Sequence, residues 1–208
     1  MVILRNQKFT MSETRIGIVG AGYIANEHLN VIKKIKDVKI EGITSRTLSK
    51  ATDLAKKFKI DNVFPSIDSM IDDCTLDGIM VLVSANQIFD VLVKLIPKGI
   101  PLFIEKPPGL NPFETKTLAD LAANHGTKNM VGFNRRYYSI FHKGIKIIND
   151  HGSLLGVNIE GHERFWNIRE ANLSNDLREN WLYANSTHTI DLLRFFGGEP
   201  ASINAFSR

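Results

Sequence analysis

The chain has 208 residues, of which 43% are hydrophobic and 23% charged, and its formal net charge is +4. This is the composition of an ordinary soluble globular protein that is long enough to bury a sizeable core. The single cysteine, Cys74, excludes an internal disulfide and fits a reducing cytosol, so we expect a cytoplasmic protein. No apolar run approaches the roughly 18 residues of a membrane span.

Basic residues are scattered among apolar ones, which is typical of a solvated helix face. A nucleic-acid surface would need clustered charges with interleaved aromatic residues, and the sequence has neither. The six histidines are dispersed, and none has a second ligand type at zinc spacing. We therefore expect no membrane, nucleic-acid or metal partner, whereas a mild positive charge suits an anionic small ligand.

Strands and helices alternate through the first two thirds of the chain. Short apolar runs predict strands at 15–19, 38–44, 62–64, 77–84, 101–105 and 129–133. Helical spacing of apolar residues and capping residues predict helices at 25–36, 48–58, 86–98, after Ser66, and from Pro112 behind the cap Asn111. This order predicts an α/β fold, a doubly wound, mostly parallel sheet of the Rossmann type over residues 13–134. Residues 1–12 are interpreted as an N-terminal extension.

The regular alternation of strands and helices stops after Arg136. We predict helices at 137–149 and 187–198 and strands at 154–162 and 201–206. Residues 135–208 are therefore interpreted as the beginning of a second, α+β domain. Two strands are too few for an independent sheet.

A glycine-rich turn follows the first predicted strand. Gly20, Gly22 and Ala25 form a G-x-G-x-x-A pattern that includes Tyr23 and Ile24 and opens the first helix. The first glycine permits the tight turn and the second lets a pyrophosphate approach the backbone, while the helix N-terminus attracts its charge. In this βαβ context the pattern predicts dinucleotide binding.

The second strand ends without the acidic residue that commonly binds the ribose hydroxyls of NAD. Ser45, Arg46 and Lys50 follow it instead, and a hydroxyl with two cationic groups suits a 2′-phosphate. We expect NADP as the cofactor, with NAD as the alternative. Ser84 and Asn86, at and just after the end of the predicted strand 77–84, are further candidate cofactor contacts.

Charged residues end the buried strand at 101–105, in the sequence "FIEKPPG". A lysine held in a partly desolvated place loses proton affinity, so Lys106 could take part in proton transfer. The alternative is that Glu105 and Lys106 only turn the chain toward solvent.

The turn "GAGYIA", the strand end "EKP" and the helix "HTIDLLRFFGG" occur in this order, and together they resemble the glucose-fructose oxidoreductase/inositol dehydrogenase (Gfo/Idh/MocA) family. The resemblance implies a Rossmann domain followed by an open-sheet domain for substrate binding and homo-oligomerisation. It also implies hydride transfer between a nicotinamide and a hydroxyl-bearing carbon of a sugar, cyclitol or nucleotide-sugar. Relatives are much longer, so the chain looks truncated in its C-terminal domain.

The same resemblance assigns roles to individual residues. It implies that Glu105 and Lys106 contact the cofactor, that Lys106 and His188 are catalytic, and that Pro107 follows a cis peptide. It implies substrate contacts from Asn134 and Arg135. Asn185, beside the position of the family aspartate, could orient a substrate hydroxyl, and Asp191, one turn after His188 on the same predicted helix, is a further candidate for substrate contact.

A departure from the family pattern leaves alternatives open. Ala184 stands where many members have an aspartate four residues before the histidine. The chain could therefore be a dinucleotide-binding regulatory protein without turnover, or a glycosidase-like hydrolase that uses the nicotinamide transiently.

His28, on the first predicted helix, is expected to have a surface or capping role.

Overall fold

The computed structural model describes residues 13–171 and 173–206, and the predicted extension at residues 1–12 lies outside them. Six parallel strands form one sheet in the order β3-β2-β1-β4-β5-β6. Their bounds are β1 Thr14–Val19, β2 Val38–Thr44, β3 Val63–Phe64, β4 Gly78–Val81, β5 Leu102–Ile104 and β6 Asn129–Val131. The predicted α/β fold with a doubly wound sheet is confirmed.

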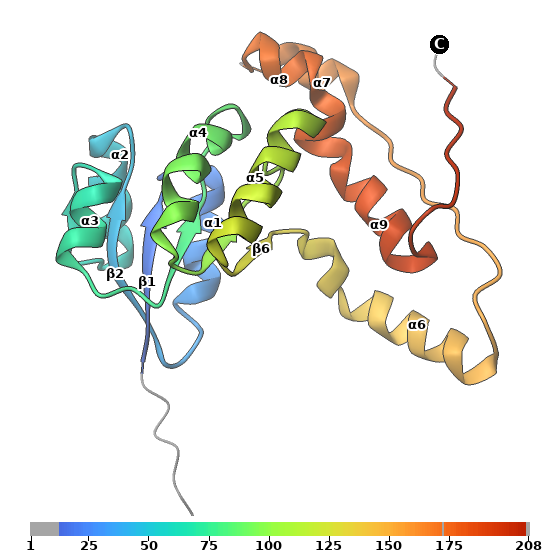
Figure 1. Cartoon of the computed structure of the whole chain (residues 1–208), viewed down its shortest axis with the longest axis horizontal. Helices are drawn as coiled ribbons and strands as arrows, with labels where there is room; N and C mark the ends of the chain where they lie inside the picture. The colour runs from blue at the N-terminus through green and yellow to red at the C-terminus, as the bar shows by residue number, and fades with distance from the viewer. Residues whose placement is uncertain (1–12, 172, 207–208) are drawn as a thin grey trace, which may run out of the picture.

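Helices connect the strands as the periodicity predicts (Figure 1). Their bounds are α1 Tyr23–Ile32, α2 Leu48–Phe58, α3 Ile67–Asp73, α4 Ala85–Leu95 with the 3-10 turn η1 Ile96–Lys98, and α5 Pro112–His125. The predicted caps form, since Ser66 accepts from the backbone N–H of Ser69 and Asn111 from that of Glu114. These bonds satisfy amide groups that the first turn leaves free.

Two apolar clusters cover the two faces of the sheet. On one face the strand residue Ile18 packs under α1 and α2, where Leu29 is fully buried. On the other face Val81 packs under α3, α4 and α5, and Leu92 of α4 is fully buried.

The chain changes face because right-handed crossovers run from β1 toward β3 and then from β3 back to β4. The change of direction leaves a switch point between β1 and β4 at the carboxyl edge.

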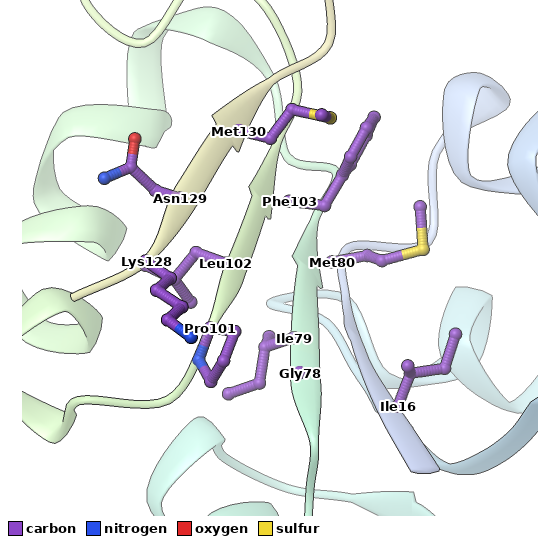
Figure 2. A pocket seen from close by; sticks show the side chains of 10 residues that line it. All are labelled: Ile16, Gly78, Ile79, Met80, Pro101, Leu102, Phe103, Lys128, Asn129 and Met130. Carbon is purple, nitrogen blue, oxygen red and sulfur yellow. The ribbon is translucent and has the colours of Figure 1, made fainter. Parts of the chain in front are cut away.

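Helices α1 and α2 cover only the β1–β3 half of their face, and an apolar recess of about 360 Å³ remains over the other half (Figure 2). Ile16, Met80, Phe103 and Met130 point into this side from four neighbouring strands. Met130 is 51% exposed, so within the described residues this half of the face is not fully covered.

The C-terminal third contains helices but no strand within its described residues. The elements are the 3-10 turn η2 Asn134–Tyr137, α6 Ser139–His151, α7 Phe165–Glu170, α8 Asn175–Glu179, the π-helix η3 Leu182–Ser186 and α9 Thr187–Gly197. The strands predicted at 154–162 and 201–206 are wrong. Their alternating pattern suits a half-buried strand, but no neighbouring strand among the described residues completes a ladder of backbone hydrogen bonds. Helix α6 extends away from the sheet and buries none of its residues (Figure 1).

The glycine turn gives a test of this fold. Gly20 has a φ of +114°, and a Cβ there would lie 2.5 Å from the carbonyl oxygen of Leu82. We expect Gly20→Ala to lower the free energy of unfolding by about 3 kcal/mol, since backbone strain and a backbone clash add. The control Gly126→Ala, at φ +62° with open space around the new methyl, should cost only about 1 kcal/mol. Urea denaturation measures both, and equal losses would contradict the clash.

Candidate functional site

The loops at the carboxyl ends of β1, β2, β3 and β4 line an open cleft of about 680 Å³ at the switch point of the sheet. Open parallel sheets bind ligands at this place because the loops diverge there on opposite faces. Six of the predicted cofactor residues line the cleft, namely Gly20, Gly22, Ser45, Arg46, Lys50 and Ser84. The structure therefore brings three sequence-distant loops together around one cavity.

The glycine turn provides the floor of this cleft. The backbone N–H of Gly20 donates to the carbonyl of Thr44 over 2.8 Å and ties the turn to the end of β2. Gly22 is the N-cap of α1 and makes no side-chain cap, and a Cβ there would meet no atom within 4 Å. The first N–H groups of α1 and the open space beside Gly22 fit a pyrophosphate, since both favour an anion next to the backbone.

Arg46 contacts a residue that the sequence analysis did not single out. Gln87 of α4 also lines the cleft, and its amide oxygen, turned toward Arg46, accepts hydrogen bonds from the guanidinium, one of them 3.0 Å long. The pair joins the β2–α2 loop to α4 and fixes a cation in the cleft wall. Gln87 lies three residues after Ser84, so one helical turn directs both side chains toward the cavity. This three-residue spacing could have identified Gln87 from the sequence.

Several predicted cofactor residues lie outside the lining of this cleft. Tyr23 is 79% exposed on the first turn of α1, while Ile24 packs against the α1–α2 cluster. Asn86 lines a separate polar recess beside Leu110 and Glu114.

Glu105 and Lys106 follow the end of β5, with a cis peptide between Lys106 and Pro107. The Glu105 carboxylate is 3.2 Å from Nε2 of His28, and this imidazole packs edge-on against Phe103. The expected surface or capping role of His28 is therefore wrong, because its ring is three-quarters buried between α1 and β5. His28 holds Glu105 in place.

Lys106 points toward the C-terminal third of the chain. Its Nζ donates to the carbonyl of Ala184 over 3.1 Å and lies 3.5 Å from Oδ1 of Asn185. Burial lowers the pKa of Lys106, and Arg135 lowers it further, while Glu105 and Glu163 oppose the shift. A lower pKa makes a lysine better suited to exchange a proton with a bound ligand.

The π-helix η3 positions these partners of Lys106. It occupies Leu182–Ser186, directly before α9, and π-helical turns inside helices often accompany functional sites because they redirect backbone groups. Here the position of the family aspartate, Ala184, supplies a backbone carbonyl to Lys106. The neighbouring Asn185 supplies an amide oxygen, so two neutral acceptors face the amine.

His188 lies one turn further, on α9, and is 9% exposed. Its ring packs edge-on against Phe133, and Nδ1 is buried without a hydrogen-bond partner among the described residues. Burial lowers the pKa of His188 to about 4, helped by the positive charges of Lys106 and Arg135. The imidazole is therefore neutral at pH 7, and its Nδ1 is left without a hydrogen-bond partner among the described residues.

Asp191 was predicted to contact substrate, but its carboxylate is already paired. Arg136 donates from Nε to both oxygens, over 3.0 and 2.8 Å, and from Nη2 to Oδ1. The pair joins α9 to η2 and aligns the helix that carries His188. Of the other predicted substrate residues, Arg135 is half-buried near Lys106 and His188, and Asn134 is exposed.

A carboxylate that no motif indicated enters the same region. Glu163 accepts from Nδ2 of Asn185, at 3.2 and 3.3 Å for its two oxygens, and from the Ser186 hydroxyl at 3.0 Å. It lies one residue past the segment wrongly predicted as a strand, and no pattern in the sequence there distinguishes it from Glu160.

The profile of the family described as "Oxidoreductase family, NAD-binding Rossmann fold" (GFO_IDH_MocA) matches residues 14–133, more than half of the chain. The chain belongs to this oxidoreductase family. The resemblance inferred from the sequence motifs is confirmed.

Curated relatives extend this result. The rhizopine catabolism protein MocA of Rhizobium meliloti is 24% identical over 127 residues, which are 61% of this chain and 39% of that protein. The myo-inositol 2-dehydrogenase of Thermotoga maritima is 24% identical over 62% of this chain and 39% of its own. The inositol 2-dehydrogenase of R. meliloti strain 1021 is 24% identical over 92% of this chain and 57% of its own. The chain thus spans about two fifths of the length of the first two.

Solved structures share the fold. GenD2 from gentamicin A biosynthesis, crystallised with NAD, has a TM-score of 0.73 at 22% identity and covers 96% of this chain and 58% of its own. A putative myo-inositol dehydrogenase from Sinorhizobium meliloti 1021 has a TM-score of 0.72 at 21% identity, over 90% of this chain and 56% of its own. At this identity the likeness shows the fold alone, and it extends past the Rossmann domain.

No helix in the described part of the chain has the length and apolar content that a membrane crossing requires. The described residues also contain no group of three or more His, Cys, Asp or Glu that could hold a metal ion.

The burial of His188 gives a pH-dependent test. Its folded pKa of about 4 lies below the unfolded value near 6.5, so the stability it contributes is complete above pH 6.5 and is lost as the pH falls toward 4. We expect wild type to lose stability in this window with a slope of up to about 1.4 kcal/mol per pH unit that His188→Gln lacks. Urea denaturation at several pH values measures it. The exposed control His162→Gln should retain the slope, and a slope retained by His188→Gln would refute the assignment.

Proposed function

We propose that this chain is part of an NAD(P)-dependent oxidoreductase that transfers a hydride between a nicotinamide and a hydroxyl-bearing carbon of a sugar or cyclitol. One observation carries the proposal. The amine of Lys106, its pKa lowered by burial, lies in the same region as the neutral, buried His188, whose Nδ1 has no partner among the described residues. These two groups suit a hydroxyl that must lose a proton when its carbon loses a hydride.

Bound nicotinamide would supply the hydride acceptor. In the direction of oxidation, Lys106 in its unprotonated form would accept the proton of the substrate hydroxyl as the C–H bond gives up its electron pair as a hydride. His188, neutral at pH 7, serves as a hydrogen-bonding group for the hydroxyl. Arg135 adds a positive charge that lowers the pKa of both groups and stabilises a developing alkoxide. In the direction of reduction Lys106 returns the proton.

The substrate class follows from donors and acceptors together with the relatives. Asn134, Arg135, Asn185 and His188 offer several neutral and cationic groups, which suits a polyol. Curated relatives include an inositol 2-dehydrogenase and a glucose-6-phosphate 3-dehydrogenase, and this supports a sugar-like substrate. Because Asp191 is committed to Arg136, we assign it to positioning of α9 rather than to substrate binding.

For the cofactor we propose NADP, with NAD as the alternative. Ser45, Arg46 and Lys50 line the cleft after β2, and Gln87 holds the guanidinium there. This arrangement suits the 2′-phosphate because a planar guanidinium binds phosphate oxygens in pairs. Glu105 and Lys106, beyond the cleft, are proposed to face the nicotinamide end.

We also propose a cytoplasmic location and, for the whole protein, a homo-oligomer formed through its C-terminal domain. The oligomer is supported by apolar side chains of the C-terminal third that no other described residue covers. Ile140 and Ile147 of α6 are 67% and 52% exposed, and Ile190 of α9 is 46% exposed. Uncovered apolar residues on neighbouring elements are typical of an interaction surface.

The reaction is tested by following nicotinamide absorbance with a panel of inositols, sugars and nucleotide-sugars. We expect turnover by the full-length protein and a loss of at least about 100-fold in kcat for Lys106→Met, since a group that exchanges a proton is removed. The exposed control Lys116→Met should keep wild-type rates. Sugar release without net redox would favour the hydrolase, and cofactor binding without any turnover would favour the regulatory protein; either overturns the proposal.

Cofactor preference is tested by calorimetric titration. We expect tighter binding of NADP than of NAD, and Arg46→Gln should weaken NADP binding about tenfold or more while NAD affinity changes little, because one charged phosphate contact is lost. Lys34→Gln, at an exposed position in the turn after α1, serves as a control for the loss of one positive charge. Tighter binding of NAD by wild type would reject the NADP assignment.

A further inference from the structure

We infer that Glu163 is a positioning residue for Lys106, acting through Asn185 in the place of the aspartate that the chain lacks at Ala184. The inference rests on the proposed function, because it assigns Glu163 to the site in which Lys106 exchanges a proton. It departs from the family pattern, in which the acid stands on the helix that carries the histidine.

The hydrogen bonds define the direction of the Asn185 amide. An asparagine side chain can present either its oxygen or its nitrogen to a neighbour. Glu163 accepts from Nδ2 with both carboxylate oxygens, so Nδ2 faces Glu163 and Oδ1 faces Nζ of Lys106 at 3.5 Å. A carboxylate cannot donate to the amide oxygen, and this excludes the opposite orientation as long as Glu163 is ionised.

The Ser186 hydroxyl fixes the carboxylate itself. It donates to Oε1 of Glu163 over 3.0 Å, and both Asn185 and Ser186 belong to the π-helix η3. The segment that carries Glu163 has no regular structure from Gly152 to Arg164, so these bonds join it to the helix. The π-helix presents two adjacent side chains to one carboxylate and the carbonyl of Ala184 to Lys106.

The charge of Glu163 also acts on Lys106. Four charged or titratable groups surround the amine: Glu105 on its own loop, Arg135 on η2, His188 on α9 and Glu163. Glu105 is held by His28, while Arg135 opposes the protonated amine. Glu163 favours the protonated amine, which is the effect an aspartate at position 184 would have.

The first experiment needs no substrate. Lysine Nζ titration by NMR gives the pKa of Lys106 in wild type, Glu163→Gln and Glu160→Gln, with Lys106→Met used to assign the signal. We expect the pKa of Lys106 to fall in Glu163→Gln, because a negative charge that favours the ammonium is removed, and to stay unchanged in Glu160→Gln. Glu160 lies on the same segment with its side chain 71% exposed, so the control removes the same charge outside the site. A pKa of Lys106 that is equal in all three proteins overturns the inference.

The second experiment separates positioning from a purely structural role. With the best substrate of the panel, Glu163→Gln should lower kcat about tenfold to 100-fold with KM within about threefold, and move the Lys106 limb of the pH profile to lower pH. Adding Asn185→Ala to Glu163→Gln should cost less than the product of the single effects, because both act on one hydrogen-bonded chain. Independent effects, or an unshifted limb, overturn the inference. A wild-type protein without turnover would reject the proposed function, whereas the titration would still decide the role of Glu163.

Discussion

The close approach of two backbones at the switch point is the constraint on which the site depends. The turn after β1 passes so near the chain after β4 that a Cβ at Gly20 would meet the Leu82 carbonyl, and Gly20 is tied to β2 through Thr44. This contact brings the loops of three strands around one cleft. It also keeps the N-terminus of α1 open at Gly22, where an anion can reach the backbone.

The second part of the site is the surroundings of Lys106 at the end of β5. There Lys106 has left the sheet but is still partly buried, and it is held by neutral acceptors from the π-helix before α9. Burial lowers its proton affinity while nearby carboxylates restore part of it. The Arg136–Asp191 pair aligns α9, and Glu163 orients the amide that faces the amine. Glu105, Arg135 and Glu163 act on the charge of Lys106, and Asp191 acts on that of His188.

The lining of the cleft was more predictable than the surroundings of Lys106, for a physical reason. Ser45, Arg46 and Ser84 follow strand ends, and parallel strands in a doubly wound sheet bring their carboxyl ends to one edge. Gln87 is found by extending this reasoning one helical turn. Glu163 and the partner of Asp191 could not be found in this way, because they depend on how irregular segments fold back on α9. The strands predicted at 154–162 and 201–206 failed because a strand needs a neighbour, which no local pattern can guarantee.

The sequence by itself determined the alternating α/β order, the glycine turn, the helix caps and the family, since each rests on local chemistry or on short motifs in order. Only the tertiary structure decided what each charged group does. It paired Asp191 with Arg136, His28 with Glu105 and Asn185 with Glu163, and it left Nδ1 of His188 buried without a partner among the described residues. The pKa of a side chain depends on its distance from other charges and from water, and both are properties of the folded chain.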